Sequence, residues 1–182
     1  SKVSAEKLIL SMNGKENFCP TVLRFATAFG LSPRMRFDLT VNEFIRELAL
    51  GNELVVFDAD TWRPYCHVED FARLIECVLK APEELIINQV FNAGGDENNA
   101  TKRMIVDKIL EKVPSGKVKY KDFGSDPRNY IVDFSKVRNA LDFTPKFSIE
   151  MGIDEILKEI NTGNLDAVDI NKNFHGNYDI VL

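Results

Sequence analysis

Short runs rich in β-branched and aromatic residues alternate along this chain with longer segments whose apolar residues recur every three or four positions. The first pattern is typical of buried strands and the second of amphipathic helices. We predict strands at 19–29, 53–57, 89–93 and 118–120, and helices at 2–13, 38–50, 69–81, 101–113, 135–141 and 148–163. This alternation predicts an α/β fold class with at least some parallel pairing.

The segment at 60–70 gathers the only tryptophan, a tyrosine, an arginine and one of the two histidines. We predict it as a loop between a strand and a helix, where rigid elements on each side fix its side chains. An arginine beside aromatic rings suits a phosphate-bearing ligand. The alternative is a structural connection, in which Trp62 and Tyr65 fill core and Arg63 pairs with a carboxylate.

Charge and hydropathy exclude several classes of protein. With a net charge of -5 and no dense Lys/Arg run, the chain lacks the basic surface that a nucleic-acid partner requires. No apolar run approaches the roughly 20 residues that span a bilayer, so we expect no membrane segment. Three cysteines are an odd number for a disulfide framework, which favours reduced thiols and a cytoplasmic location.

Motifs for metals and cofactors are incomplete. Cys66 and His67 have no partner pair, since the other histidine is His175 near the C-terminal end, and we expect no metal site. A Cys–His nucleophilic pair is disfavoured too, because neighbours on an extended segment point to opposite sides. Gly94 and Gly95 are too few to form a Gly-rich phosphate cradle. The chain therefore contains no complete cofactor-binding fingerprint.

Four separated motifs occur in a consistent order. They are Ser-Lys at the head of the first helix, Leu-Arg-Phe-Ala-Thr-Ala-Phe-Gly at 23–30, Arg-Pro-Tyr-Cys-His-Val-Glu-Asp at 63–70 and Asp-Pro-Arg-Asn-Tyr at 126–130. Over about residues 1–160 the chain thereby resembles the C-terminal part of NAD-dependent sugar-nucleotide epimerases and dehydratases, which belong to the extended short-chain dehydrogenase/reductase family.

The resemblance implies the C-terminal portion of a Rossmann-type parallel sheet plus a smaller α/β substrate-binding domain. Residues 1–37 would form the residual end of the dinucleotide-binding domain. Residues 38–163 would be mainly the substrate-binding domain, with some strands returning to the first domain's sheet. Residues 164–182 are mostly polar and without a clear period, which predicts a C-terminal tail.

Lys2 is similar to the lysine of the family's Tyr-x-x-x-Lys motif. That lysine holds the nicotinamide ribose of NAD and lowers the pKa of the tyrosine, which acts as base. The tyrosine would lie four residues upstream of Lys2, outside this chain, and the alternative for Lys2 is an exposed helix lysine. We therefore expect NAD as the cofactor of a parent enzyme, a missing N-terminal segment, and poor NAD binding by this chain alone.

The resemblance also implies two arginines for the substrate, a nucleoside-diphosphate sugar. Arg63 and Arg128 are similar to arginines that bind its diphosphate, and two guanidinium groups suit the charge and geometry of that group. The alternative for each is a structural ion pair with Glu69, Asp70 or Asp126.

Further substrate contacts follow from the resemblance. Val55 and Phe57 lie on the strand that runs along the nucleotide base, although plain sheet core is the alternative. Arg36 and Asn42 lie where a loop and a helix reach the substrate, and Tyr130 where a ring hydroxyl approaches the sugar or phosphate.

Thr27 stands where the family often has an asparagine that donates to a phosphate oxygen. Its hydroxyl can also donate but is shorter than the carboxamide. His67 is predicted to be structural and to tie the 60–70 segment to the following helix.

The family's chemistry is oxidation of a sugar hydroxyl by hydride transfer to NAD, followed by epimerisation, elimination or reduction. This chain lacks the Gly-rich motif and the tyrosine, so we predict a substrate-binding portion that is inactive alone. The alternatives are a non-catalytic sugar-nucleotide binding or assembly module and a structural α/β domain without a ligand. Family members often dimerise through the Tyr-x-x-x-Lys helix, which predicts a homodimer.

Overall fold

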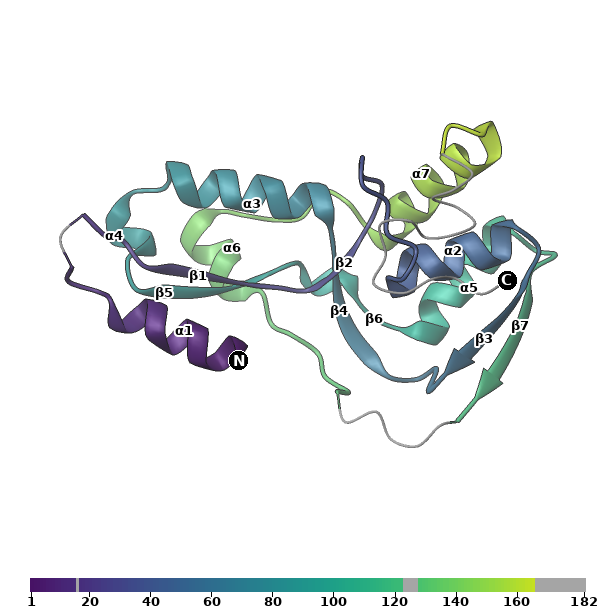
Figure 1. Cartoon of the computed structure of the whole chain (residues 1–182), viewed down its shortest axis with the longest axis horizontal. Coiled ribbons are helices and arrows are strands. Elements are labelled where there is room, and N and C mark those ends of the chain that lie inside the picture. Colours follow the sequence, from purple (N-terminus) through teal and green to yellow (C-terminus); the bar gives the residue numbers. More distant parts are fainter. Residues whose placement is uncertain (16, 123–127, 166–182) are drawn as a thin grey trace.

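Two pairs of parallel strands lie at opposite ends of an elongated molecule, and a third sheet joins them (Figure 1). The computed structural model describes residues 1–15, 17–122 and 128–165. The strands are β1 (Thr21–Phe25), β2 (Thr27–Phe29), β3 (Glu53–Phe57), β4 (Trp62–His67), β5 (Gln89–Ala93), β6 (Asn99–Thr101) and β7 (Lys117–Lys121). The helices are α1 (Lys2–Ser11), α2 (Thr40–Ala49), α3 (Val68–Lys80), α4 (Glu83–Ile86), α5 (Lys102–Lys112), α6 (Ser135–Leu141), α7 (Ile149–Thr162) and the 3-10 helix η1 (Asp96–Asn98).

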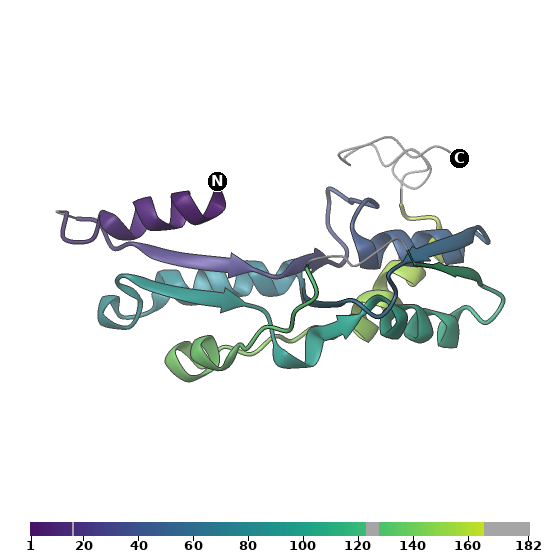
Figure 2. The same cartoon turned by 90° about the horizontal axis from the view of Figure 1, so that it is seen from below.

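Parallel pairing dominates the sheets. β1 pairs with β5, β2 with β4 and β3 with β7, all parallel, while β6 joins β4 antiparallel. Helices α1 and α3 lie on opposite sides of the β1–β5 pair, and α2, α5 and α7 gather at the other end (Figures 1 and 2). The predicted α/β fold class is confirmed. The domain division at residue 37 stays a prediction, and the predicted tail lies outside the described residues from 166 onward.

The apolar run at 19–29 forms two strands where one was predicted. β1 pairs with β5 and β2 pairs with β4, so the run crosses from one sheet to another at Ala26. The N–H of Ala26 still donates to the carbonyl of Ala93 (3.1 Å), which is the last contact with the first sheet. A pattern of apolar residues reports burial but not the partner strand, and the break was therefore invisible in the sequence.

The segment at 60–70 was predicted as a loop, and this was wrong, because Trp62 to His67 form β4 and lead directly into α3. The pairing of β4 with β6 ends at Pro64, which has no N–H to donate, and its pairing with β2 begins at Tyr65. The strand thus changes partner at its proline. The aromatic rings of Trp62 and Tyr65, which suit a strand, outweighed the proline and the arginine.

Side-chain caps fix several helix starts. Thr101 accepts from the N–H of Met104 (3.2 Å) and Ser148 from that of Met151 (3.2 Å), so both residues, where the predicted helices 101–113 and 148–163 begin, cap α5 and α7. The helix predicted to begin at Asp38 begins later, since the N-cap of α2 is Leu39 and Asp38 does not cap it. The carboxylate of Asp38 is instead held by the guanidinium of Arg36 (2.7 Å).

Candidate functional site

The two segments that carry the predicted diphosphate arginines meet at the backbone of Trp62. The N–H of Trp62 donates to Oδ1 of Asn129 (2.9 Å), and its carbonyl accepts from the N–H of Tyr130 (3.3 Å). Arg128 directly precedes Asn129, and Arg63 directly follows Trp62. The fold therefore brings the Arg63 and Arg128 segments side by side, as one site for both arginines requires.

The guanidinium of Arg63 is held within this junction. Its Nη1 donates to the carbonyl of Trp62 (2.9 Å), and its central carbon lies 5.4 Å from the centroid of the Tyr130 ring. A guanidinium resting on a ring face has fewer rotamers to lose when it binds an anion. Arg128 and Tyr130 are both exposed.

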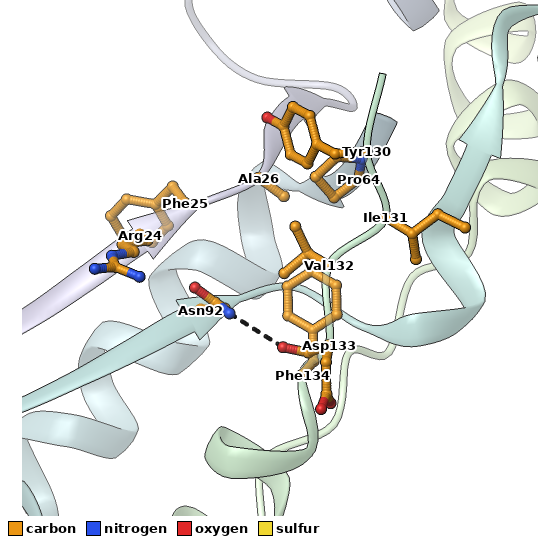
Figure 3. A pocket seen from close by; sticks show the side chains of 10 residues that line it. All are labelled: Arg24, Phe25, Ala26, Pro64, Asn92, Tyr130, Ile131, Val132, Asp133 and Phe134. Carbon is orange, nitrogen blue, oxygen red and sulfur yellow. Dashed lines mark hydrogen bonds between the residues drawn. The ribbon is translucent and has the colours of Figure 1, made fainter. Parts of the chain in front are cut away.

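A cavity of about 420 Å³ adjoins the junction at the carboxyl ends of β1 and β5 (Figure 3). Its lining residues are Arg24, Phe25, Ala26, Pro64, Asn92, Tyr130, Ile131, Val132, Asp133 and Phe134. In α/β sheets, ligands bind beyond the carboxyl ends of parallel strands. The cavity thus lies where the fold favours a ligand, and one of its walls is the segment that contacts Arg63.

Thr27 lies at the same end of the sheet. It is the half-buried first residue of β2, next to Ala26 of the cavity wall, and it pairs across from Tyr65 of β4. Arg63 precedes Tyr65 by two positions. The structure therefore gathers Thr27, Arg63 and Tyr130 in one region, and their roles in substrate binding stay predictions.

Lys2 is exposed in the first turn of α1. One turn later Glu6 accepts two hydrogen bonds from Arg24 of β1 (2.8 and 2.6 Å), which lower the pKa of Glu6 and fasten α1 to β1. The N-terminus of the chain lies toward the carboxyl end of β1 (Figures 1 and 2). Lys2 therefore lies toward the same end of the sheet as the cavity, and its role in NAD binding stays a prediction.

Val55 and Phe57 lie on the outer face of the β3–β7 pair, while Leu54 and Val56, which alternate with them, are in the core. Phe57 is 40% exposed and Val55 is half-buried. The alternative of plain sheet core is thus wrong for Phe57. In the β3–β7 register they face Lys119 and Lys121, so the surface predicted to follow the nucleotide base has a basic border.

Asn42 and Arg36 hold the loop after β2. Buried Asn42 accepts from the N–H of Gly30 (3.0 Å) and donates to the carbonyl of Arg36 (3.0 Å). The Arg36 guanidinium makes two hydrogen bonds to Asp38 (3.0 and 2.7 Å). These contacts shape the loop from Gly30 to Asp38, whereas direct contact of Asn42 or Arg36 with a substrate stays a prediction.

His67 has the structural role predicted from the sequence. Its Nδ1 accepts from the N–H of Glu69 (3.2 Å) and caps α3, and its Nε2 lies 2.6 Å from Oε1 of Glu155 in α7. The same Glu155 oxygen accepts from the N–H of Leu31 (2.7 Å). Burial favours neutral Glu155, but the hydrogen bonds from His67 and Leu31 outweigh it and lower the pKa of Glu155.

The surroundings of Cys66 disfavour a nucleophilic role. Cys66 is buried in β4, and this burial raises the pKa of its thiol to about 12, so the reactive thiolate is not populated near neutral pH. Across residues 1–15, 17–122 and 128–165, no cluster of three or more His, Cys, Asp or Glu side chains has the arrangement of a metal site.

Three asparagines of the site were missed by the sequence analysis. Asn129 binds Trp62, while Asn92 and Asn99 bind the backbone of the 132–133 segment. An asparagine beside an arginine, as at Asn129, or at the end of a strand or the start of one, as at Asn92 and Asn99, is a weak signal, because asparagine is common near turns. Only the tertiary pairing distinguishes them.

Comparisons with known proteins agree with this geometry. The model of the NAD dependent epimerase/dehydratase family matches residues 1–94, more than half of the chain. The chain is 26% identical over 157 residues to an uncharacterised UDP-glucose epimerase of Bacillus subtilis and 27% identical over 157 residues to a UDP-glucuronate 4-epimerase of Thermodesulfobacterium geofontis. These alignments cover 84% of this chain but 48% and 46% of the relatives, so the chain spans about half of their length.

Solved structures share the fold. A dTDP-glucose 4,6-dehydratase of Bacillus anthracis in complex with NAD aligns with a TM-score of 0.75 at 24% identity, over 90% of this chain and 51% of its own. A UDP-glucuronic acid 4-epimerase of Bacillus cereus in complex with UDP-glucuronic acid and NAD aligns with a TM-score of 0.75 at 24% identity, over 88% and 51%. From the family match and this shared fold, we conclude that the chain belongs to the NAD dependent epimerase/dehydratase family.

Proposed function

We propose that this chain is the substrate-binding portion of an NAD-dependent nucleoside-diphosphate-sugar epimerase or dehydratase. The observation that carries the proposal is the junction of Arg63 with the 128–130 segment at the backbone of Trp62. In it, Arg63 and Arg128 bind the two phosphates, and the Thr27 hydroxyl donates to a phosphate oxygen. Guanidinium–phosphate hydrogen bonds are charge-assisted and can be bidentate, which suits a diphosphate.

The base and the sugar extend from the diphosphate in opposite directions in this proposal. Val55 and Phe57 contact the base on the outer face of the β3–β7 pair, while Arg36 and Asn42 shape the loop that closes over the substrate. The Tyr130 hydroxyl contacts the sugar or a phosphate. The 420 Å³ cavity at the ends of β1 and β5 takes the sugar.

NAD fits only part of this chain. The N-terminus, next to Lys2, lies toward the carboxyl end of β1, where Lys2 would hold the nicotinamide ribose, but the sequence has no Gly-rich cradle for the pyrophosphate. Bound NAD would supply the hydride acceptor. We propose that a preceding segment supplies this cradle and the tyrosine base, and that the chain by itself binds NAD poorly and turns over no substrate.

The free edge of β1 is the proposed contact for that segment. Among the residues that the structure describes, β1 pairs with β5 alone, and Phe25 at its end is 45% exposed. An open edge beside apolar surface is a template for a further strand. The exposed apolar residues of α1, Val3 and Leu8, are the proposed contact of a homodimer.

The cytoplasm is the proposed location of the protein. Cys19, Cys66 and Cys77 are all free, as expected in a reducing compartment.

Nucleotide binding tests the proposal. UDP-, dTDP-, CDP- and GDP-sugars are titrated into the chain while its thermal unfolding is followed, and one class should stabilise it by about 2.7 kcal/mol at a hundredfold excess over its Kd. Arg63→Ala should weaken that binding roughly tenfold or more, because a charge-assisted contact is lost. No stabilisation by any sugar nucleotide would favour the structural domain without a ligand.

The second candidate is a non-catalytic sugar-nucleotide binding or assembly module, favoured by the absence of the Gly-rich cradle from this sequence. Both candidates predict nucleotide binding. They differ when a segment with the cradle and tyrosine is joined to residue 1, because only the enzyme portion then turns over a sugar nucleotide with NAD.

A further inference from the structure

The segment at 132–134 runs beside the cavity in an extended path outside any sheet, yet side chains hold its backbone. The carboxamide of Asn99 accepts from the N–H of Val132 (3.1 Å) and donates to its carbonyl (3.0 Å). Asn92 donates to the carbonyl of Asp133 (3.1 Å; Figure 3), and Asp96 accepts from the N–H of Phe134 (3.1 Å). Three side chains thus replace the hydrogen bonds that a neighbouring strand would supply.

Asn99 differs from Asn92 and Asp96 because it binds both the N–H and the carbonyl of one residue, Val132. It begins β6, where it pairs across from Pro64 of β4, while Ala100 pairs across from Arg63. Its backbone is therefore registered to the strand that carries Arg63. Its side chain also donates to the carbonyl of Asp96 (3.2 Å), which orients the carboxamide.

This contact reaches Arg63 through the 130–132 segment. Val132, gripped by Asn99, lies two residues after Tyr130, whose N–H donates to the carbonyl of Trp62 (3.3 Å). The ring of Tyr130 lies 5.4 Å from the Arg63 guanidinium. The Asn99 side chain thus links β4, with which β6 pairs, to the segment that begins at Arg128.

We infer that Asn99 is a positioning residue of the diphosphate site, whose two hydrogen bonds to Val132 hold Tyr130 and Arg128 against Arg63. The inference rests on the proposed function for its ligand. Without the carboxamide, the Val132 backbone groups turn to water and the segment swings away from β4. Arg63 then loses its aromatic support, and the two arginines no longer converge on a diphosphate.

The first test uses the fluorescence of Trp62, the only tryptophan of the chain, and needs no nucleotide. In Asn99→Ala, release of the 129–130 segment from the Trp62 backbone should expose half-buried Trp62 further. Its emission should then shift to the red, and acrylamide quenching should rise about twofold. Asn139→Ala is the matched control, since Asn139 is exposed on α6. Trp62 emission and quenching identical in Asn99→Ala and Asn139→Ala would overturn the inference.

The second test compares UDP with uridine. Asn99→Ala should weaken UDP binding roughly tenfold and leave uridine binding unchanged, and it should add nothing in an Arg63→Ala background, because both changes remove the same contact. Additive losses, or equal losses for uridine, would indicate a general structural effect and overturn the positioning role. Failure of the unchanged chain to bind UDP, together with release of Trp62 in Asn99→Ala, would overturn the proposed diphosphate site and leave the Asn99 contact in place.

Asn99→Asp keeps the test decisive if the alanine variant does not fold. The carboxylate still accepts from the N–H of Val132 but has no donor for its carbonyl. The logarithm of the UDP affinity should therefore fall by about half as much as in Asn99→Ala. Circular dichroism establishes that each variant is folded. Unchanged UDP affinity in folded Asn99→Asp and unchanged Trp62 quenching would contradict the inference.

Discussion

The two ends of the molecule are built on the same unit, a pair of parallel strands, but they bury it to different extents. The cluster around β3, α2, α5 and α7 contains 19 buried hydrophobic residues among those described, whereas the cluster around β5, α3 and α6 contains 7. Apolar side chains that stay exposed are frequent at the β1–β5 end, where they include Val3, Leu8, Phe25, Ile75 and Leu79. One end therefore has a core of its own, and the other has apolar surface suited to a further segment.

This difference bears on function because the candidate site lies between the two ends. Arg63 is on β4 of the joining sheet, Thr27 is on β2, and the cavity opens at the ends of β1 and β5. If the β1–β5 end is completed by a preceding segment, that segment also closes the unfinished side of the site. In the proposed function, this chain then binds part of the substrate, and the preceding segment supplies the NAD cradle and the base.

The largest expected effect comes from the smaller core. Phe91 is fully buried in β5, and Phe91→Ala should cost about 3–5 kcal/mol, because the cavity that it leaves has few neighbours to fill it. Hydrogen exchange followed by mass spectrometry should show faster exchange in β1 and β5 but little change in β3 and β7.

Ile109→Ala is the matched change in the larger core, at a residue that is equally buried in α5. It should speed exchange in β3 and β7 first. If both variants speed exchange evenly along the whole chain, the two ends unfold as one cooperative unit and the contrast between them is wrong.

The next effect concerns Gly30, at the end of β2 beside the larger core. Its φ is +108°, and an added Cβ would lie 2.0 Å from Nε2 of His67. Gly30→Ala should therefore cost about 2–4 kcal/mol in urea unfolding, through backbone strain and displacement of the buried histidine.

Gly51→Ala separates these two causes. Gly51 has a φ of +78°, but no atom lies within 4 Å of its added Cβ, so only the strain of about 1 kcal/mol remains. Equal losses for the two variants would show that His67 yields to the new methyl group without cost.

The fold class and most elements could be predicted from the sequence because they depend on local pattern. The spacing of apolar residues located α3 and α5, and Thr101 and Ser148 marked helix starts by their own chemistry. The strand break at Ala26 and the strand character of Trp62 to His67 could not be predicted, because both depend on which strands pair. Local pattern carries no information about partners.

The candidate site divides in the same way. Arg63 and Arg128 were predicted as diphosphate-binding residues from their motifs, and the structure brings their segments together at Trp62, while their role stays a prediction. Asn99 was not identified, because its only distinguishing property is a contact with Val132, 33 positions later. Residues that bind a ligand have characteristic chemistry, whereas residues that position them are identified by geometry alone.

A smaller effect is expected from pH at the Glu155–His67 pair, which fastens α7 to β2 and β4. The folded pKa of Glu155 lies below its ordinary value of 4.5, so its stabilisation is fully present above that pH and is lost as the pH falls through the folded pKa. Over this acid range, the free energy of unfolding of the unchanged chain should fall by about 1 kcal/mol more than that of Glu155→Gln. Parallel stability curves for the two proteins below pH 4.5 would show that the pair contributes nothing.

The smallest effect on stability, within about 0.5 kcal/mol, is expected for Leu8→Ser on α1, because this side chain is 65% exposed and leaves no cavity.

The effect of Leu8→Ser should appear in association instead. If the apolar side of α1 contacts a second copy or a preceding segment, Leu8→Ser lowers the average mass measured by light scattering at high concentration. Lys7→Ser, at the neighbouring exposed position, should leave it unchanged. A serine in the larger core would unfold that end of the molecule. At exposed Leu8, the serine changes association and leaves the free energy of unfolding almost unchanged. A mass that stays equal to one chain in all three proteins would contradict self-association through α1.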